Sequence, residues 1–209
     1  VIPLGNAHLG RWTSASEERR RRVRRARGWD DHFVVLNVCR FHTAERAYKG
    51  VDFYADVQAA LQVIDPELSM RSVFVLCGKG DPTDVVAMQD RGLSVFANVT
   101  DDEMTDLYAA ADLYANFSRW EGYNLGIGQA LAMGLPVVAS DIPAHRAFGV
   151  TLTSSPAEAA RRVRDFGRRH SDRRPRVWEW DESLRAFAAE IADVAAKGLT
   201  WDARNAGLA

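Results

Sequence analysis

The sequence predicts an α/β protein built on a doubly wound, Rossmann-like parallel sheet. Short, continuously apolar runs alternate with amphipathic stretches of helical period, as in strands that are covered on both faces by helices. The chain of 209 residues, 47% of them hydrophobic, is long enough to bury such a core in one large domain. In this architecture ligands bind at the carboxyl ends of the strands, where the strand order reverses.

The apolar runs place five strands and a sixth, weaker one, at 33–39, 73–77, 93–96, 113–116, 136–139 and 150–152. Helices are expected between and after them, at 49–64, 101–110, 124–133, 156–169 and 182–196. A helix-start signal at 14–18 precedes a further, arginine-rich segment. We expect residues 1–197 to form one domain and 198–209 a C-terminal tail.

Charge and cysteine content exclude several classes of protein. Lysine and arginine total 27 against 28 aspartates and glutamates, so no global field recruits nucleic acid. No apolar run approaches the roughly 18 residues of a membrane span. Cys39 and Cys77 lie in expected strands, where buried, reduced thiols of a cytoplasmic protein are the simplest interpretation.

Two segments are locally basic. Residues 19–27 contain seven arginines in nine positions, and a second basic stretch spans 161–176. Both are interpreted as solvated helix faces whose side-chain stems cover apolar surface. Binding of phosphate groups or peripheral contact with an anionic membrane is the open alternative.

Charged residues and a glycine turn follow the expected strands. Arg40 comes after the first strand and Lys49 after a long loop, while Glu121 and Gly122 follow the fourth strand and lead into a helix. A helix N-terminus and two cations suit a phosphate group, and the carboxylate suits a hydroxylated neighbour. The turn Gly78-Lys79-Gly80 lacks the spacing of a phosphate-binding glycine loop and is expected to be a tight turn.

Residues 118–146, SRWEGYNLGIGQALAMGLPVVASDIPAHR, resemble the donor-site signature of family 4 retaining glycosyltransferases, which have the two-domain GT-B fold. Further blocks agree in order, at 1–5, 33–40, 49–50, 73–80, 101–113 and 178–181. The resemblance implies the C-terminal, nucleotide-sugar-binding half of such an enzyme. The acceptor-binding N-terminal domain would be missing, which fits a chain that opens at Val1 without a methionine.

The implied reaction moves a sugar from a nucleoside-diphosphate sugar to a hydroxyl of an acceptor glycan, lipid or small molecule. The resemblance implies no cofactor and no metal, and no clustered histidine–aspartate set stands out in the sequence. It also implies that this chain alone is inactive without its N-terminal domain.

Roles for individual residues follow from the resemblance. Arg40 and Lys49 would hold the donor diphosphate, and the Glu121 carboxylate would accept hydrogen bonds from the sugar. The backbone amides after Glu121 would contact the pyrophosphate or sugar, and two residues after the third strand would contact the base. These backbone positions are Gly122, Tyr123, Asn124 and Leu125 for the first contact, and Asn98 and Val99 for the second.

The chain departs from the family pattern at Gln129, where the second glutamate of the motif would grip both ribose hydroxyls. Glutamine offers a single acceptor, and the loss of a charged hydrogen bond costs about 1 kcal/mol. Weakened donor binding is expected, and a catalytically lapsed nucleotide-sugar-binding or regulatory module of the same fold is the alternative. Three extra residues between Arg40 and Lys49 place the Lys49 assignment in question, and His145 is expected at the surface or at a helix cap.

Overall fold

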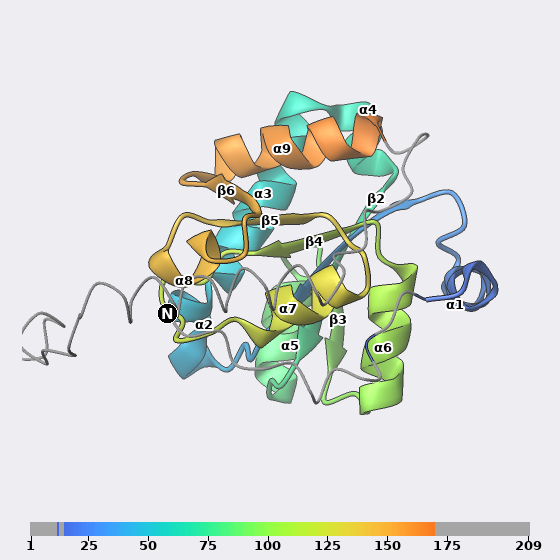
Figure 1. The fold of residues 1–209 in the computed structure, drawn as a ribbon, viewed down its shortest axis with the longest axis horizontal. Coiled ribbons are helices and arrows are strands. Elements are labelled where there is room, and N and C mark those ends of the chain that lie inside the picture. Colours follow the sequence, from blue (N-terminus) through green and yellow to red (C-terminus); the bar gives the residue numbers. More distant parts are fainter. Residues whose placement is uncertain (1–11, 13–14, 170–209) are drawn as a thin grey trace, which may run out of the picture. The chain divides into compact units, whose positions relative to one another are not determined.

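A computed structural model describes Trp12 and residues 15–169 of the chain. Its centre is a six-stranded sheet in which every neighbouring pair of strands is parallel (Figure 1). The strands are β1 Phe33–Val38, β2 Ser72–Gly78, β3 Ser94–Ala97, β4 Leu113–Asn116, β5 Val137–Ser140 and β6 Thr151–Thr153. The predicted doubly wound α/β class is therefore confirmed, and each expected strand lies within about a residue of its predicted bounds.

The strand order is β3-β2-β1-β4-β5-β6. The chain winds outward from β1 in one direction and then returns to build the other half beside it, starting with β4. This reversal places the switch point of the fold between β1 and β4. Hydrogen-bonded register pairs Val35 with Leu113 and Leu36 with Tyr114 across it.

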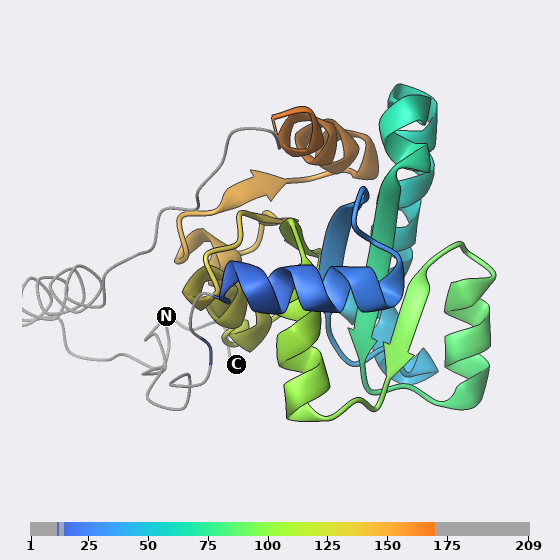
Figure 2. The ribbon, with the colours of Figure 1, turned by 90° about the vertical axis from the view of Figure 1, so that its right-hand side faces the viewer.

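Helices cover both faces of the sheet, as the apolar strands require. On one face, the buried cluster joins strand residues to α3 Val51–Ile64, α4 Pro66–Met70, α5 Pro82–Gln89 and α9 Pro156–Arg168. On the other face, it joins them to α1 Glu17–Arg27, α6 Asp101–Ala110 and α7 Leu125–Ala132. Figure 2 shows α1 crossing in front of the sheet, with α6 beside it. The short helices α2 Thr43–Lys49 and α8 Pro143–Arg146 lie at loops that follow β1 and β5.

The segment between Arg40 and Lys49 was expected to be a long loop, and this prediction was wrong, whereas the helix expected over 49–64 is present as α3, which starts two residues later. Residues 43–49 form α2, which ends at Gly50 in the left-handed conformation (φ 65°), and α3 starts afresh at Val51. A Cβ atom at residue 50 would collide with the backbone carbonyl of Phe117. Glycine therefore allows both the left-handed turn and the close approach of this junction to the end of β4.

The arginine run of α1 is only partly a solvated face. Arg24 is buried and donates to Asp112 Oδ2 (3.0 Å) and to the Ala110 carbonyl (2.7 Å), and Arg20 also pairs with Asp112. The same carboxylate accepts the backbone N–H of Val34 at 2.7 Å. Since Asp112 and Val34 lie at the amino ends of β4 and β1, these bonds fix α1 to that edge of the sheet.

None of the helices in the described part of the chain is long and apolar enough to span a membrane. Cys39 and Cys77 are free thiols, and desolvation raises the pKa of each to about 12. Cys77 is buried, as expected, whereas Cys39 is only partly buried. The helix at 182–196, the sequence blocks at 1–5 and 178–181, and the tail at 198–209 lie outside the described residues.

Candidate functional site

A buried ion pair lies at the switch point between β1 and β4. Lys49 Nζ, at the end of α2, lies 2.7 Å from Glu121 Oε1, in the loop after β4. Both side chains are largely buried, with exposed fractions of 13% and 12%. The segment before Lys49 forms α2, which ends at this lysine and places it beside Glu121.

Ser118 completes this group. Its hydroxyl donates to Glu121 Oε1 at 2.8 Å, so lysine and serine converge on the same carboxylate oxygen. Within residues 15–169, no hydrogen bond or ion pair reaches the second oxygen, Oε2. A carboxylate held at one oxygen can accept hydrogen bonds from hydroxyl groups at the other. Ser118 has no role in the sequence interpretation, although its spacing of three residues before Glu121 was visible there.

The position of Lys49 is fixed by contacts between α2 and the end of β4. The Arg119 backbone N–H donates to the Tyr48 carbonyl at 2.7 Å, and the glycine at position 50 packs against Phe117. Two loops that are about 70 residues apart in sequence are thus joined directly beside the ion pair. The sequence reading could not find this contact because it depends on the two strands being neighbours.

Arg40 is partly exposed and pairs with a carboxylate other than Glu121. Its guanidinium pairs with Glu45 at 2.8 Å, and Tyr48 also donates to Glu45 Oε1 at 2.8 Å. The pKa of Tyr48 is raised, and the hydrogen bond to Glu45 is the largest cause of this shift. The Arg40 side chain is 55% exposed. Arg40, which precedes α2, and Lys49, its last residue, thus have different carboxylate partners, and the structure does not join them to each other.

The turn at 122–125 leads into helix α7, as predicted. Asn124 is its N-cap: Oδ1 accepts the backbone N–H of Ile127 at 3.1 Å. Leu125 is exposed at the first position of the helix, and the Tyr123 ring packs on Phe148. At Gly122 a Cβ atom would meet nothing within 4 Å, so neither space nor a left-handed φ requires glycine there.

Gln129 lies on the first turns of α7 and faces α6. Its Oε1 lies 3.1 Å from the Tyr108 hydroxyl, which also contacts the Gly126 carbonyl at 3.2 Å. The carbonyl oxygen of this amide is therefore used within the protein. A ligand at this position would meet the amide NH₂ group, a hydrogen-bond donor.

Asn98 and Val99 follow β3, two strands away from the switch point along the same edge. Asn98 adopts a left-handed φ of 56°. Its side chain donates to the Gly80 carbonyl at 3.0 Å and its backbone N–H to the Gly78 carbonyl at 2.8 Å. The residue thus joins the loops after β2 and β3 at the carboxyl edge, where the sequence placed it.

The Gly78-Lys79-Gly80 turn has a packing role. A Cβ atom at Gly78 would collide with the Cys39 carbonyl, and one at Gly80 with the Phe41 ring. Backbone hydrogen bonds from Cys39 N to Cys77 O and from Phe41 N to Lys79 O continue the pairing of β1 with β2 beyond the sheet. The glycines therefore let the chain after β1 pass close to this turn.

His145 was expected at the surface or at a helix cap, and the structure contradicts only the first of these: the ring is buried and contacts the N-cap residue of α7. It is fully buried on α8, with Nδ1 2.9 Å from the Ser140 carbonyl and Nε2 2.9 Å from Asn124 Nδ2. Burial is the largest cause that lowers its pKa from 6.5. The ring contacts the N-cap of α7 and so belongs to the support of the turn at 122–125.

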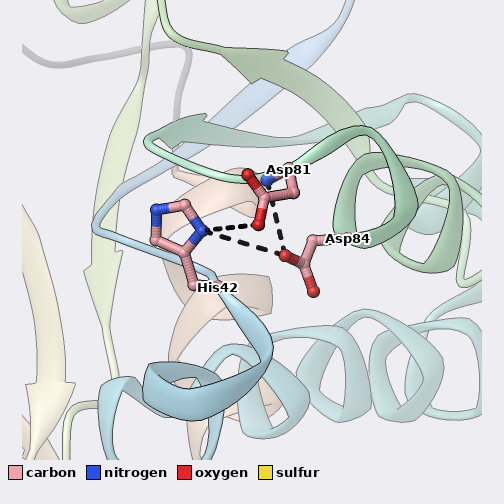
Figure 3. Close-up of side chains that lie close together, drawn as sticks. All are labelled: His42, Asp81 and Asp84. Atoms are coloured by element: carbon pink, nitrogen blue, oxygen red, sulfur yellow. Dashed lines mark hydrogen bonds and ion pairs between the residues drawn. The ribbon is translucent and has the colours of Figure 1, made fainter.

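Among the residues that the structure describes, the fold brings together one set of metal-ligating side chains, where the sequence indicated none. His42 Nδ1 lies 3.4 Å from Asp81 Oδ2 and 4.0 Å from Asp84 Oδ2 (Figure 3). Asp84 also accepts hydrogen bonds from the Thr43 hydroxyl, at 2.6 Å, and from the backbone N–H of Asp81, the N-cap of α5. The bond from Thr43 is the largest cause that lowers the pKa of Asp84. Helix capping and the two contacts of His42 with these carboxylates account for the positions, and we assign no metal to them.

A pocket of about 470 Å³ lies at the opposite edge of the sheet. His32 and Arg71, which line it, precede the amino ends of β1 and β2, and Arg24, Glu67 and Arg168 complete a wall of mixed charge. It contains none of the predicted site residues. The described site is therefore the carboxyl edge between β1 and β4.

The strand order defines a Rossmann-like α/β domain, and the buried polar group of Lys49, Glu121 and Ser118 lies at its switch point, where folds of this class bind ligands. The sequence profile of the family described as Glycosyl transferases group 1 matches residues 32–166. The chain belongs to this family. No curated protein matches the sequence.

Solved structures with the same fold include glycosyltransferases. WaaG, a glycosyltransferase involved in lipopolysaccharide biosynthesis, has a TM-score of 0.58 and 18% identity, over 79% of this chain and 50% of its own. Anabaena Alr3699/HepE in complex with UDP-glucose has a TM-score of 0.61 and 21% identity, over 74% and 44%. The same protein with UDP and glucose has a TM-score of 0.61 and 20% identity, over 90% and 54%. The chain spans about half the length of these proteins, and its sheet matches their GT-B Rossmann-like domain.

Proposed function

We propose that this chain is the donor-binding half of a retaining glycosyltransferase, which moves a sugar from a nucleoside-diphosphate sugar to an acceptor hydroxyl. The buried group formed by Lys49, Glu121 and Ser118 at the switch point carries the proposal. It presents a cation beside a carboxylate that is oriented for hydroxyl groups. The UDP-glucose and UDP complexes of the similar Anabaena protein support this ligand class.

The chemistry follows from where charge develops. The bond between the anomeric carbon and the diphosphate breaks, the bond to the acceptor oxygen forms on the same face, and the departing phosphate takes the acceptor proton. As the bond to the anomeric carbon breaks, negative charge grows on the diphosphate, where Lys49 and the N-terminus of α7 stabilise it. Glu121 orients the sugar, and the acceptor is bound by a domain outside this chain. No cofactor and no metal takes part in this scheme.

Arg40 joins this site only if it exchanges partners. In the described structure its guanidinium is paired with Glu45, so it would have to leave that carboxylate to meet a phosphate. The guanidinium is more than half exposed, and such a surface pair contributes only about 0–1 kcal/mol. A dianionic diphosphate competes easily with a pair of this strength.

The Gln129 amide supports an alternative, a catalytically lapsed nucleotide-sugar-binding or regulatory module. Its NH₂ group would donate to one ribose oxygen, whereas a carboxylate could accept from two hydroxyls. We expect donor affinity about tenfold lower than with glutamate. If Gln129→Glu strengthens binding by that factor while the full-length protein transfers no sugar, the lapsed module is correct.

A thermal-shift panel of UDP, GDP, ADP, TDP and their common sugar conjugates tests the proposal on the chain itself. A ligand at a hundredfold excess over its dissociation constant stabilises by about 2.7 kcal/mol, which is roughly 5–10 °C for a domain of this size. One nucleotide series should raise the melting temperature, and Glu121→Ala should remove the increment that the sugar adds.

Gly122→Ala is the sharpest companion variant. Since a Cβ atom there meets nothing in the protein, the melting temperature without ligand should stay unchanged. If the backbone at this turn lies against the ligand, the added methyl group should lower donor affinity at least tenfold. Equal binding by Gly122→Ala and the parent chain, or no stabilisation by any nucleotide, would contradict the proposed site.

A further inference from the structure

We infer that His145 is a positioning residue of the donor site and that donor binding requires its imidazole ring to be neutral. Only the second claim, that donor binding requires the neutral ring, rests on the proposed function. The first half concerns the folded chain alone: a neutral ring holds the Asn124 cap, and with it the turn at 122–125. His145 itself touches neither substrate nor reacting atoms in this scheme.

The contacts of His145 determine its tautomer. The Ser140 carbonyl can only accept a hydrogen bond, so Nδ1, 2.9 Å away, must carry the proton. On the other side, Asn124 Oδ1 is already committed to the Ile127 N–H, which turns the Nδ2 group toward the ring. Nε2 must therefore accept from Asn124 Nδ2. Both nitrogens are used, and the arrangement fits only the neutral ring.

The same network reaches the Glu121 carboxylate. Asn124 Nδ2 also donates to Asn116 Oδ1 at 3.0 Å, and that oxygen accepts the backbone N–H of Ser118 at 3.1 Å. The Ser140 hydroxyl lies 3.2 Å from His145 Nδ1 and contacts the Ser118 carbonyl. Ser118 in turn donates to Glu121. The imidazole thus supports both the backbone turn and the orientation of the carboxylate.

Protonation would place two hydrogen-bond donors, Nε2–H and Asn124 Nδ2–H, against each other in a fully buried space. Burial is the main reason why the pKa of His145 lies below 6.5, and the Ser140 carbonyl and Glu121 act in the opposite direction. Lys49 also lowers it. The charged neighbours on its own side, Asp141 and Arg146, are exposed and paired with each other at 2.6 Å.

Two substitutions separate positioning from simple packing. Glutamine places an acceptor oxygen near the position of Nε2, whereas asparagine places a donor near Nδ1 only. If the bond to Asn124 matters, His145→Gln should bind UDP-glucose within about threefold of the parent chain, and His145→Asn about tenfold more weakly. His32→Gln, at the opposite edge of the sheet, is the matched control and should change nothing.

The pH dependence is the second readout. UDP-glucose is the probe, since its diphosphate has no terminal phosphate group that titrates near neutral pH. Affinity of the parent chain should be constant above pH 6.5 and fall at lower pH, as the ring gains its proton. His145→Gln should lose this acid sensitivity while it retains affinity at neutral pH.

The ring itself can be observed without any nucleotide. Nitrogen-15 NMR of the imidazole should show the Nδ1–H tautomer at neutral pH, and the Ile127 amide should lose protection from exchange in His145→Asn. The inference is overturned, whether or not a nucleotide sugar binds, by a charged ring at pH 7 or by an Ile127 amide that is equally protected in His145→Asn and in the parent chain. If the NMR result holds but no nucleotide sugar binds, the proposed function fails instead. If UDP-glucose binds equally to all variants at every pH, only the inference fails.

Discussion

At the scale of single residues, the site is determined by which oxygen of Glu121 is occupied. Lys49 and Ser118 both donate to Oε1, so the carboxylate is fixed in orientation while its charge is balanced in a largely buried place. A largely buried ion pair with an added hydrogen bond is worth more than a surface pair, because water screens it less. The three side chains should therefore behave as one energetic unit.

A double-mutant cycle with Lys49→Met and Glu121→Gln tests this coupling. Either single change leaves the partner charge largely buried without its counter-ion and should lower the free energy of unfolding by about 1–3 kcal/mol. The double variant should lose little more than one single variant, since both partners are then neutral. Urea denaturation measures the cycle. Additive losses would show that the two side chains are not coupled.

At the scale of elements, the arginine-rich helix α1 is joined to the sheet by one fully buried carboxylate. Asp112 accepts hydrogen bonds from Arg20, Arg24 and the Val34 backbone, and its side chain has no exposed surface. Several of the arginines in this helix therefore serve the fold. The outward-facing ones, such as Arg21 and Arg22, leave only a small basic surface for a phosphate group or an anionic membrane.

Asp112→Asn should destabilise the chain by about 3–5 kcal/mol, because it removes one partner of a buried charge network. Asp106→Asn is the matched control. This aspartate also joins α6 to an arginine of α1, at 2.7 Å from Arg19, but its side chain is 30% exposed. Its loss should cost less than about 1 kcal/mol. Similar changes in urea midpoint for both variants would show that burial does not set the strength of these pairs.

At the scale of the whole molecule, stability should depend on pH in two steps. Several carboxylates have pKa values lowered by hydrogen bonds, and each contributes stability above its ordinary pKa that is lost as the pH falls. They are Asp65 beside Arg168, Asp84 beside Thr43, Glu103 at the Thr100 cap and Asp141 beside Arg146. His145, whose pKa is also lowered, binds a proton more readily in the unfolded chain and adds an earlier loss below pH 6.5.

The free energy of unfolding should thus be level above pH 6.5, decline slightly below it, and fall steeply below pH 4.5, the ordinary glutamate value. Urea midpoints between pH 3 and 8 measure this profile. His145→Gln should remove the first decline and leave the second. A profile that starts to fall only below pH 4.5 in the parent chain would contradict the role of the imidazole.

Much of this molecule was predictable because its strands are buried on both faces. Continuous apolar runs located all six strands, and the turn into α7 with Glu121 beside it was visible from residue types alone. Prediction failed where the chain needed information about a neighbour in space. Gly50 divides two helices because Phe117 approaches it, and His145 is buried because Asn124 and Ser140 bind both of its nitrogens.

The sequence by itself determined the fold class, the order of elements and the residue types at the ends of the strands, since local periodicity and turn chemistry do not depend on distant contacts. Only the tertiary structure decided which of those residues meet. Lys49 reaches Glu121, Arg40 is paired with Glu45, and Gln129 turns its carbonyl to Tyr108, because the pairing of β1 with β4 and the helices against them set these distances. Side chains far apart in sequence become one site when parallel strands end at the same edge of a sheet.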